Sequence, residues 1–351
     1  MVRLPSSLAK AISVLTTRDA ADHTMGIITL LRNALGIFRG DSHAPPVTPR
    51  PVRQPKIQIY GPAGIRQLVR TTFKLTHTRS ADQYCVHELL FPGEEASAPA
   101  DDVECLHPSE EAGTDIHCAP DGFWRKIAFQ ATSSGRCDVI VDAGPIEHRG
   151  DRRIFQAQLN ESTPYTLYPR SIVILGDTSN PTALIPLVKE NPTTRVSLLV
   201  HEATDAYIPP HVDPHQSTGK NRTAQSVTQK AIEKGHSTPA MAGIFARQIG
   251  AEMLALNHIG ARFPAPPAFP RSGRDKFRRE CMAEIETQAN RVWMLDGGGT
   301  ATAVSDFDQI VIAPIPPVPN EAFESQEEEY FAEGVSPTAG PSSGHAVREH
   351  N

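Results

Sequence analysis

Four short apolar runs, each followed by a polar cluster, set the strongest limit on how this chain folds. They lie at residues 139–141, 171–175, 196–200 and 252–256. Apolar runs of this length are typical of buried strands. Segments with helical spacing lie between them, at residues 182–190 and 239–248. Because strands that alternate with helices favour layered α/β proteins, we expect the α/β class for residues 138–263.

The segment at 239–248 has clear helix boundaries. Ser237 or Thr238 can cap its first turn, Pro239 suits that turn, and Gly250 suits the C-terminal end. Spacing also predicts helices at 25–38, 63–75 and 275–290, and strands at 56–60 and 310–312.

Proline distribution indicates which parts of the chain lie outside the core. The 351 residues include 31 prolines, and these cluster. We predict one folded domain over residues 1–313, interrupted by a disordered insertion at about 92–120 that is rich in Pro, Glu and Asp. Residues 314–351, rich in Pro, Ser and Glu, are predicted to be a disordered tail.

Charge and cysteine content describe the class of protein. The net charge of −6 gives no sign of a basic nucleic-acid-binding face, although the acidity is concentrated in local stretches. Five scattered cysteines without CxxC spacing favour a reduced protein rather than a disulfide scaffold. No apolar run approaches the length of about 20 residues that spans a membrane. We expect no membrane association and a cytoplasmic or nuclear location.

Polar residues recur where the predicted strands end. His148 follows the first run after a short turn, Asp177 follows the second, Glu202 the third and His258 the fourth. A further pair, Asp22–His23, precedes the first long helix. Strand ends commonly carry ligand-binding side chains in α/β proteins, and Asp and His are suitable ligands for Zn²⁺ or Mn²⁺.

Each of these signals is weak when taken alone. A single Asp-His pair is more often surface polarity than a metal site, and a single Gly-Asp-Thr is more often a turn. A lone His after a strand is usually structural. Their joint recurrence at strand ends is what makes a functional site worth testing.

Three segments together resemble the RNase Z family of tRNA 3′-processing endonucleases, within the metallo-β-lactamase superfamily. They read SIVILGDT at 171–178, LLVHEAT at 198–204 and GHSTPAMAGIFARQIGAEMLALNHIGARF at 235–263. Weaker likeness extends over residues 14–75 and 137–312. The resemblance implies the metallo-β-lactamase fold, an αββα sandwich of two mixed sheets with helices outside.

The resemblance also implies a role for each matched residue. Asp22, His23, Asp177 and His258 would hold one Zn²⁺, and His148 with the bridging Asp177 would hold a second. The catalytic set would be Asp22, His236 and Glu202, with His236 donating a proton to the leaving oxygen and Glu202 orienting it. Two structural alternatives remain open: His236 could help to cap the following helix, and Glu202 could be a buried hydrogen-bonding residue.

The chain departs from the family at its metal motif, His-x-His-x-Asp-His. The two leading histidines are replaced by Arg18 and Ala20, so one of the two metal sites is expected to be depleted. Only 21 residues precede Asp22, so we expect the fold to be incomplete at its N-terminus. The 28 residues between His148 and Asp177 include no Gly- and Pro-rich tRNA-gripping arm. A mis-joined or truncated gene and a diverged paralogue both explain these losses.

The function implied by the resemblance is that of a zinc-dependent endoribonuclease that removes 3′ trailers from precursor tRNA, as a homodimer. Two alternatives stay open: a catalytically impaired RNase Z-like paralogue, and a metallohydrolase of small phosphodiesters.

Overall fold

The computed structural model describes residues 12–15, 21–36, 55–131, 138–148, 151–154, 157–158, 160–162, 170–269, 271–293, 300–306 and 308–312. Only the backbone is described at 12–15, 21–25, 128–131, 138–139, 151–154, 157–158 and 160–162. The chain divides into two units, residues 1–313 and 314–351, and the second lies wholly outside the described residues. The predicted disordered tail therefore stays a prediction.

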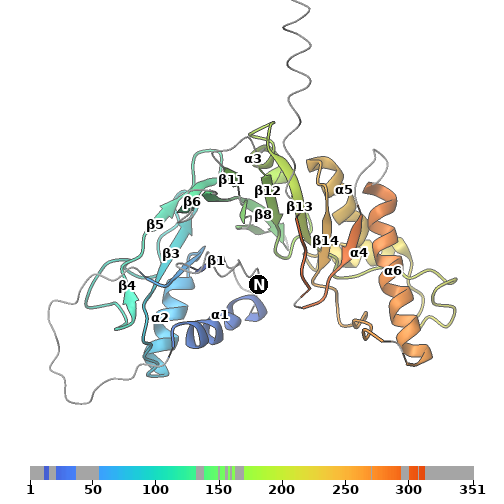
Figure 1. Ribbon diagram of the computed structural model, residues 1–351, viewed down its shortest axis with the longest axis horizontal. Coiled ribbons are helices and arrows are strands. Elements are labelled where there is room, and N and C mark those ends of the chain that lie inside the picture. Colours follow the sequence, from blue (N-terminus) through green and yellow to red (C-terminus); the bar gives the residue numbers. More distant parts are fainter. Residues whose placement is uncertain are drawn as a thin grey trace, which may run out of the picture. The chain divides into compact units, whose positions relative to one another are not determined.

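The first sheet is parallel and carries two helices (Figure 1). Its strands run in the order β1-β2-β3-β4, with β5 also paired to β3. The bounds are β1 Ile12–Leu15, β2 Ile57–Pro62, β3 Tyr84–Leu90, β4 Glu110–Glu111 and β5 Asp115–His117. Helices α1 (Ala21–Ala34) and α2 (Ile65–Leu75) cover it, because Leu31 and Phe73 pack with Ile57 and Ile59 in one buried cluster.

The second sheet is mixed and has the order β15-β14-β13-β12-β11-β7-β6, with β10 paired to β12. Strands β12 to β15 pair in parallel, whereas β6, β7 and β11 pair antiparallel. The bounds are β6 Trp124–Ala131, β7 Asp138–Ala143, β10 Ala157–Gln158, β11 Asn160–Ser162, β12 Arg170–Ile174, β13 Arg195–Glu202, β14 Leu254–Asn257 and β15 Ala301–Ala303. A separate hairpin pairs β8 (Pro145–His148) with β9 (Asp151–Ile154).

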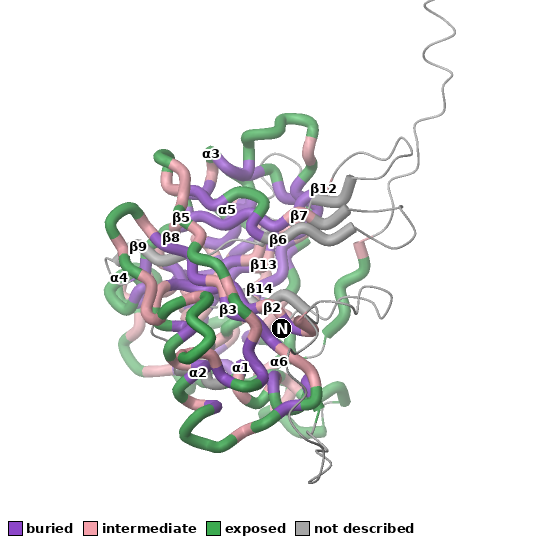
Figure 2. The backbone as a smooth tube through the Cα atoms, turned by 90° about the vertical axis from the view of Figure 1, so that its left-hand side faces the viewer, coloured by how far each residue is buried: buried purple, intermediate pink, exposed green. Residues whose placement is uncertain are grey.

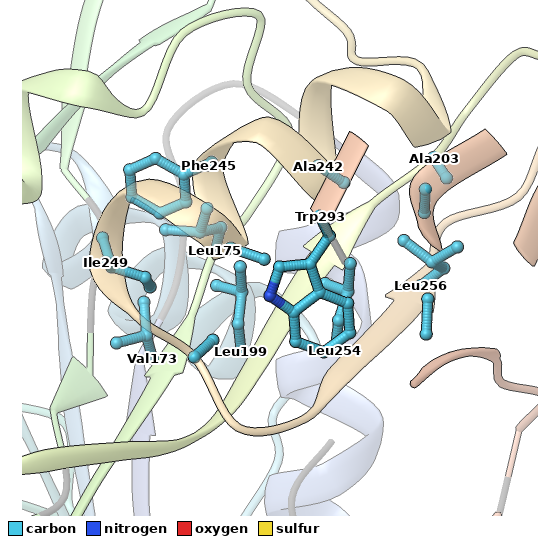
Figure 3. Packing of buried hydrophobic residues seen from close by; sticks show 14 of the residues in the cluster. Val173, Leu175, Leu199, Ala203, Ala242, Phe245, Ile249, Leu254, Leu256 and Trp293 are labelled. Carbon is cyan, nitrogen blue, oxygen red and sulfur yellow. The ribbon is translucent and has the colours of Figure 1, made fainter. Parts of the chain in front are cut away.

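Helices also cover the second sheet. They are α3 (Ile185–Val188, after a 3₁₀ turn at Thr182–Leu184), α5 (Pro239–Ile249) and α6 (Gly273–Trp293), which all contribute residues to its buried cluster. A further helix, α4 (Ala224–Glu233), precedes α5. Figure 3 shows Phe245 and Ile249 of α5 and Trp293 of α6 packed with side chains of the central strands. A Cβ at Gly243 would lie 2.3 Å from the Ala289 carbonyl oxygen, so this glycine allows α5 and α6 to approach closely. Buried residues concentrate in strands such as β13 and β14 (Figure 2).

A third buried cluster joins the two sheets. It combines Tyr60 and Leu89 of the first sheet with Trp124, Val141 and Ala143 of the second. Because successive side chains of a strand point to opposite faces, Ile59 packs toward the helices while Tyr60 packs toward the other sheet. The layer order helix–sheet–sheet–helix follows, which confirms the predicted α/β class and its αββα arrangement. The expectation of two mixed sheets is corrected, because the described strands of the first sheet all pair in parallel.

Helix α5 begins and ends as its sequence predicts. Thr238 is the N-cap residue, Pro239 opens the helix, and Gly250 closes it with a left-handed φ of 67°. The predicted strand at 310–312 is wrong, because residues 308–312 are described and form no strand. Within the described residues the strand nearest to them is β15, which lies earlier and pairs with β14. No helix in the described part of the chain combines the length and apolar character needed to cross a membrane.

The expected disordered insertion at about 92–120 is corrected by the structure. Strands β4 and β5 lie within it and pair with β3. Arg66 and Arg70 of α2 reach into it: Arg66 bonds the Ala98 and Thr114 carbonyls, and Arg70 forms a two-pronged ion pair with Glu110. Because these buried guanidiniums find their partners here, the segment is ordered despite its acidic, Pro-rich composition.

Candidate functional site

Three neighbouring parallel strands deliver the polar residues of the candidate site. Asp177 lies shortly after β12, Glu202 is the last residue of β13, and His258 directly follows β14. Strands β12, β13 and β14 pair side by side in parallel, so their carboxyl ends share one edge of the sheet. The Nδ1 atom of His258 lies 3.5 Å from Asp177 Oδ1 and 3.9 Å from Glu202 Oε2.

Two further histidines arrive from outside this sheet. His148 ends β8, and His236 lies between α4 and α5 directly after Gly235, whose φ is 78°. The His236 ring stacks on that of His258 with centroids 5.4 Å apart, and meets the ring of His148 edge-on at 5.3 Å. Five side chains from separate elements therefore converge.

Main-chain and side-chain bonds fix the loops that carry these residues. The Ser237 hydroxyl donates to the Thr178 carbonyl at 2.6 Å, and the Ala203 amide donates to the Asn257 carbonyl at 2.9 Å. The His236 amide donates to the Ala231 carbonyl at 2.8 Å. The strand ends are thus linked to the loop before α5, which holds the site in one geometry.

Glu202 is buried and surrounded by donors. Its side chain is 1% exposed. The Thr178 amide donates to Oε1 at 2.6 Å, the Thr204 hydroxyl donates to Oε2, and His236 Nδ1 lies 3.2 Å from Oε2. Because a carboxylate oxygen accepts, the hydrogen bond to Glu202 places the His236 proton on Nδ1.

His148 has the environment of a metal-ligating imidazole. Its Nδ1 lies 2.6 Å from the Gly235 carbonyl oxygen, and a carbonyl can only accept, so Nδ1 carries the proton and Nε2 the lone pair. Metal-bound histidines usually donate their other N–H to a carbonyl or carboxylate in this way. The sequence motif containing Gly235 therefore orients the ring of His148, 87 positions away.

The donor set suits a metal ion. Ligand atoms of His148, Asp177 and His236 lie within 4.8 Å of one another, as do those of Glu202, His236 and His258. Imidazole nitrogen and carboxylate oxygen are donors that Zn²⁺ accepts in tetrahedral sites. His148, Asp177 and His258, three of the five predicted ligands, are brought together by the fold.

The other two predicted ligands, Asp22 and His23, lie in α1, and their side chains are outside the described residues. Arg18 and Ala20 are outside them as well. The depletion of one metal site therefore stays a prediction. His201 of the HEAT segment is fully buried against Phe245, and burial lowers its pKa below the usual range for histidine.

Sequence reasoning did not assign roles to Thr204 and Thr178. The Thr204 hydroxyl contacts Glu202 and lies 2.9 Å from His258 Nδ1, and the Thr178 amide supplies a donor to Glu202. Thr178 directly follows Asp177 and ends the segment GDT. Thr204 lies two residues after Glu202 and ends the segment HEAT. Their place within these segments was the signal available.

Comparison with known proteins relates the chain to zinc phosphodiesterases. No protein-family model matches. "Zinc phosphodiesterase ELAC protein 1" of Homo sapiens is 29% identical over 306 residues, 74% of this chain and 75% of that protein. The Mus musculus protein of the same name is 28% identical over 305 residues, 73% of this chain and 74% of that protein. "Ribonuclease Z" of Streptococcus pyogenes serotype M5 (strain Manfredo) is 26% identical over 221 residues, 60% of this chain and 62% of that protein.

Solved structures with some likeness include human tRNase Z, short form (ELAC1). Its TM-score is 0.46 at 22% identity, with 86% of this chain and 79% of that chain covered. The metallo-β-lactamase fold protein YhfI from Bacillus subtilis has a TM-score of 0.32 at 14% identity, with 72% and 77% covered.

Proposed function

Because the chain is a relative of ribonuclease Z and of the zinc phosphodiesterases named ELAC protein 1, we propose that it is a metal-dependent endoribonuclease that removes 3′ trailers from precursor tRNA. One observation carries the proposal: Asp177, Glu202 and His258 meet at the ends of three adjacent parallel strands, where His148 and His236 join them. Residues 1–313 would form the catalytic domain.

His148, Asp177 and His258 would hold zinc, together with Asp22 and His23. Bound Zn²⁺ supplies a Lewis acid that activates water and neutralises charge on a phosphodiester. Asp177 suits a shared ligand, because its carboxylate lies within 4.8 Å of a ring nitrogen of His148 on one side and beside the ring of His258 on the other. Asp22 stays in the catalytic set as a prediction.

His236 would act as the proton donor to the leaving oxygen. The adjacent Glu202 carboxylate stabilises the protonated imidazole and holds the proton on Nδ1, so Nε2 is the atom available for transfer. Glu202 is too buried to reach a polynucleotide, with its side chain 1% exposed, whereas His236 is 14% exposed. Glu202 would therefore orient the His236 ring, and His236 would contact the substrate.

The substrate would be precursor tRNA, and the partner a second copy of the chain, as is usual for short members of the resembled family. A cytoplasmic or nuclear location is part of the same proposal. The N-terminal departures at Arg18 and Ala20 favour weak activity in the chain as written, because both positions would carry ligands in that family.

The test is cleavage of a precursor tRNA with a defined 3′ trailer, using Zn²⁺-loaded wild type and Asp177→Asn. We expect the wild type to release the trailer, and the Asn variant, which loses a charged ligand, to be at least 100-fold slower. The matched control is Asp121→Asn, an exposed carboxylate that pairs with Arg125 away from the site. Equal rates for wild type and Asp177→Asn would contradict the proposal.

A second arm separates the alternatives. Turnover of bis(p-nitrophenyl) phosphate without tRNA cleavage would indicate a hydrolase of small phosphodiesters. Absence of both activities would indicate an impaired paralogue, and the double variant Arg18→His/Ala20→His then shows whether the motif histidines are the cause. Recovery of trailer cleavage in that variant would support a metal site of the RNase Z type in this protein.

A further inference from the structure

The Thr204 hydroxyl occupies a junction between three site residues. It makes a short hydrogen bond to Glu202 Oε2, lies 2.9 Å from His258 Nδ1, and lies 3.5 Å from His236 Nδ1. One side chain therefore touches both the buried carboxylate and the two stacked histidines. The arrangement of protons at this junction follows from which atoms can donate.

A hydroxyl has one proton and can accept others. Glu202 Oε2 can only accept, and its contact with Thr204 is the shortest of the set, so the Thr204 proton points to Glu202. The hydroxyl oxygen then accepts from His258, which requires the proton of that ring to lie on Nδ1. Asp177 Oδ1, at 3.5 Å from the same Nδ1, favours the same proton position.

The backbone of Thr204 is held without its hydroxyl. Its amide donates to the Ser237 carbonyl at 3.0 Å, and its carbonyl accepts from the Gly260 amide at 3.0 Å. Gly260 packs closely, since a Cβ there would lie 2.6 Å from the Thr204 carbonyl oxygen. Replacing Thr204 with the similarly shaped valine therefore removes the hydroxyl while these main-chain bonds remain.

We propose that Thr204 is a positioning residue whose hydroxyl fixes the His258 proton on Nδ1, so that Nε2 keeps the lone pair that a metal ion needs. The same hydroxyl holds Glu202 Oε2 in the orientation in which His236 contacts it. The metal part of this inference rests on the proposed function, whereas the proton position of His258 does not.

The first experiment reads the His258 tautomer by ¹⁵N NMR of metal-free, histidine-labelled protein, with the His258 signals assigned from His258→Gln. Wild type and Thr204→Ser should both show the Nδ1–H form. Thr204→Val should shift the ring toward Nε2–H, because the nearest acceptor for the Nδ1 proton is gone and Asp177 Oδ1 lies farther away, at 3.5 Å. Thr228→Val, on the exposed face of α4, is the matched control and should match wild type.

The second experiment measures Zn²⁺ affinity by competition with a chelating dye. Hydrogen-bond partners of metal-ligating histidines contribute about 10- to 100-fold to metal affinity. Thr204→Val should therefore bind Zn²⁺ more weakly by that factor, whereas the affinity of Thr204→Ser should stay within a few-fold of wild type. If Thr204→Val unfolds, Thr204→Ala replaces it with the same expectations. An unchanged His258 tautomer in a folded variant without the hydroxyl overturns the proposal, as does a serine variant that behaves like valine. Loss of tRNA cleavage alone bears only on the proposed function, since the tautomer is read without metal or substrate.

Discussion

Glu202 and His236, 34 positions apart in the chain, approach to 3.2 Å between Oε2 and Nδ1. Glu202 ends a central strand, and His236 precedes a helix on the outside of that sheet. The contact depends on the loop between them returning to the strand end, where the Thr204 amide bonds the Ser237 carbonyl. A buried carboxylate thereby supports an imidazole that stays accessible.

Replacing His236 with alanine tests whether this imidazole donates a proton or binds metal. General acid catalysis contributes about 10²–10⁴-fold, so we expect kcat for trailer cleavage to fall by that factor. The Zn²⁺ content, measured by elemental analysis, should stay near that of wild type. A variant that loses activity and metal together would instead assign His236 as a ligand, which its distance of 4.0 Å from Asp177 also allows.

Replacing Glu202 with glutamine tests the carboxylate as an acceptor. The glutamine amide nitrogen can only donate, so one of the three donors around this group, Thr178, Thr204 or His236, would face another donor. A buried donor left unsatisfied costs about 1–3 kcal/mol, which we expect as a loss in the free energy of unfolding measured with urea. The exposed replacement Glu233→Gln on α4 should change that free energy by less than about 0.5 kcal/mol.

Much of the sheet edge could be predicted because its signals are local. Strand β13 was expected at 196–200 and spans Arg195–Glu202. The candidate site residues at the strand ends follow from apolar runs that stop at polar residues. The α5 boundaries follow from Thr238, Pro239 and Gly250 for the same reason. Such patterns require no knowledge of which strands are neighbours.

Contacts between distant segments could not be predicted. The bond between His148 and the Gly235 carbonyl joins positions 87 apart, and its geometry depends on how the β8–β9 hairpin meets the loop before α5. The ordered segment at 92–120 was missed because composition records its charges but not the buried Arg66 and Arg70 that bind them. Local composition carries no information on such partners.

Glu88 offers a test of what orders that segment. Its buried carboxylate accepts from the Gly64 and Arg66 amides and from the amide and hydroxyl of Ser97. Glu88→Ala leaves these four donors without their acceptor and removes the buried carboxylate that lies 3.8 Å from the Arg66 guanidinium, so we expect a loss of about 3–5 kcal/mol in the free energy of unfolding. Limited proteolysis should then cut within 92–120.

The control for Glu88 is an exposed ion pair in the same sheet region. Lys56 and Asp82 are 41% and 46% exposed, so Lys56→Met should cost less than about 1 kcal/mol and leave the protease pattern unchanged. Early cleavage within 92–120 in both variants would mean that the segment is not held by Glu88.

His87 gives the stability of the first sheet a defined pH dependence. Burial, with a smaller contribution from Arg66, lowers the pKa of His87 to about 4, and its neutral ring stacks on Tyr60 and contacts Cys85 and Thr114. In the unfolded chain His87 binds a proton near pH 6.5, so the unfolded state gains protons that the folded state lacks between pH 6.5 and 4. Stability should therefore fall through this range as the pH is lowered.

The His87→Gln variant isolates this contribution, because glutamine does not titrate. The difference in free energy of unfolding between wild type and His87→Gln should shrink by about 2 kcal/mol from pH 7 to pH 4, measured by urea unfolding at matched ionic strength. The exposed His77 lies outside this cluster, and His77→Gln provides the comparison for the removal of a histidine elsewhere. A difference for His87→Gln that stays flat with pH would mean that the folded protein accommodates a charged imidazole beside Arg66.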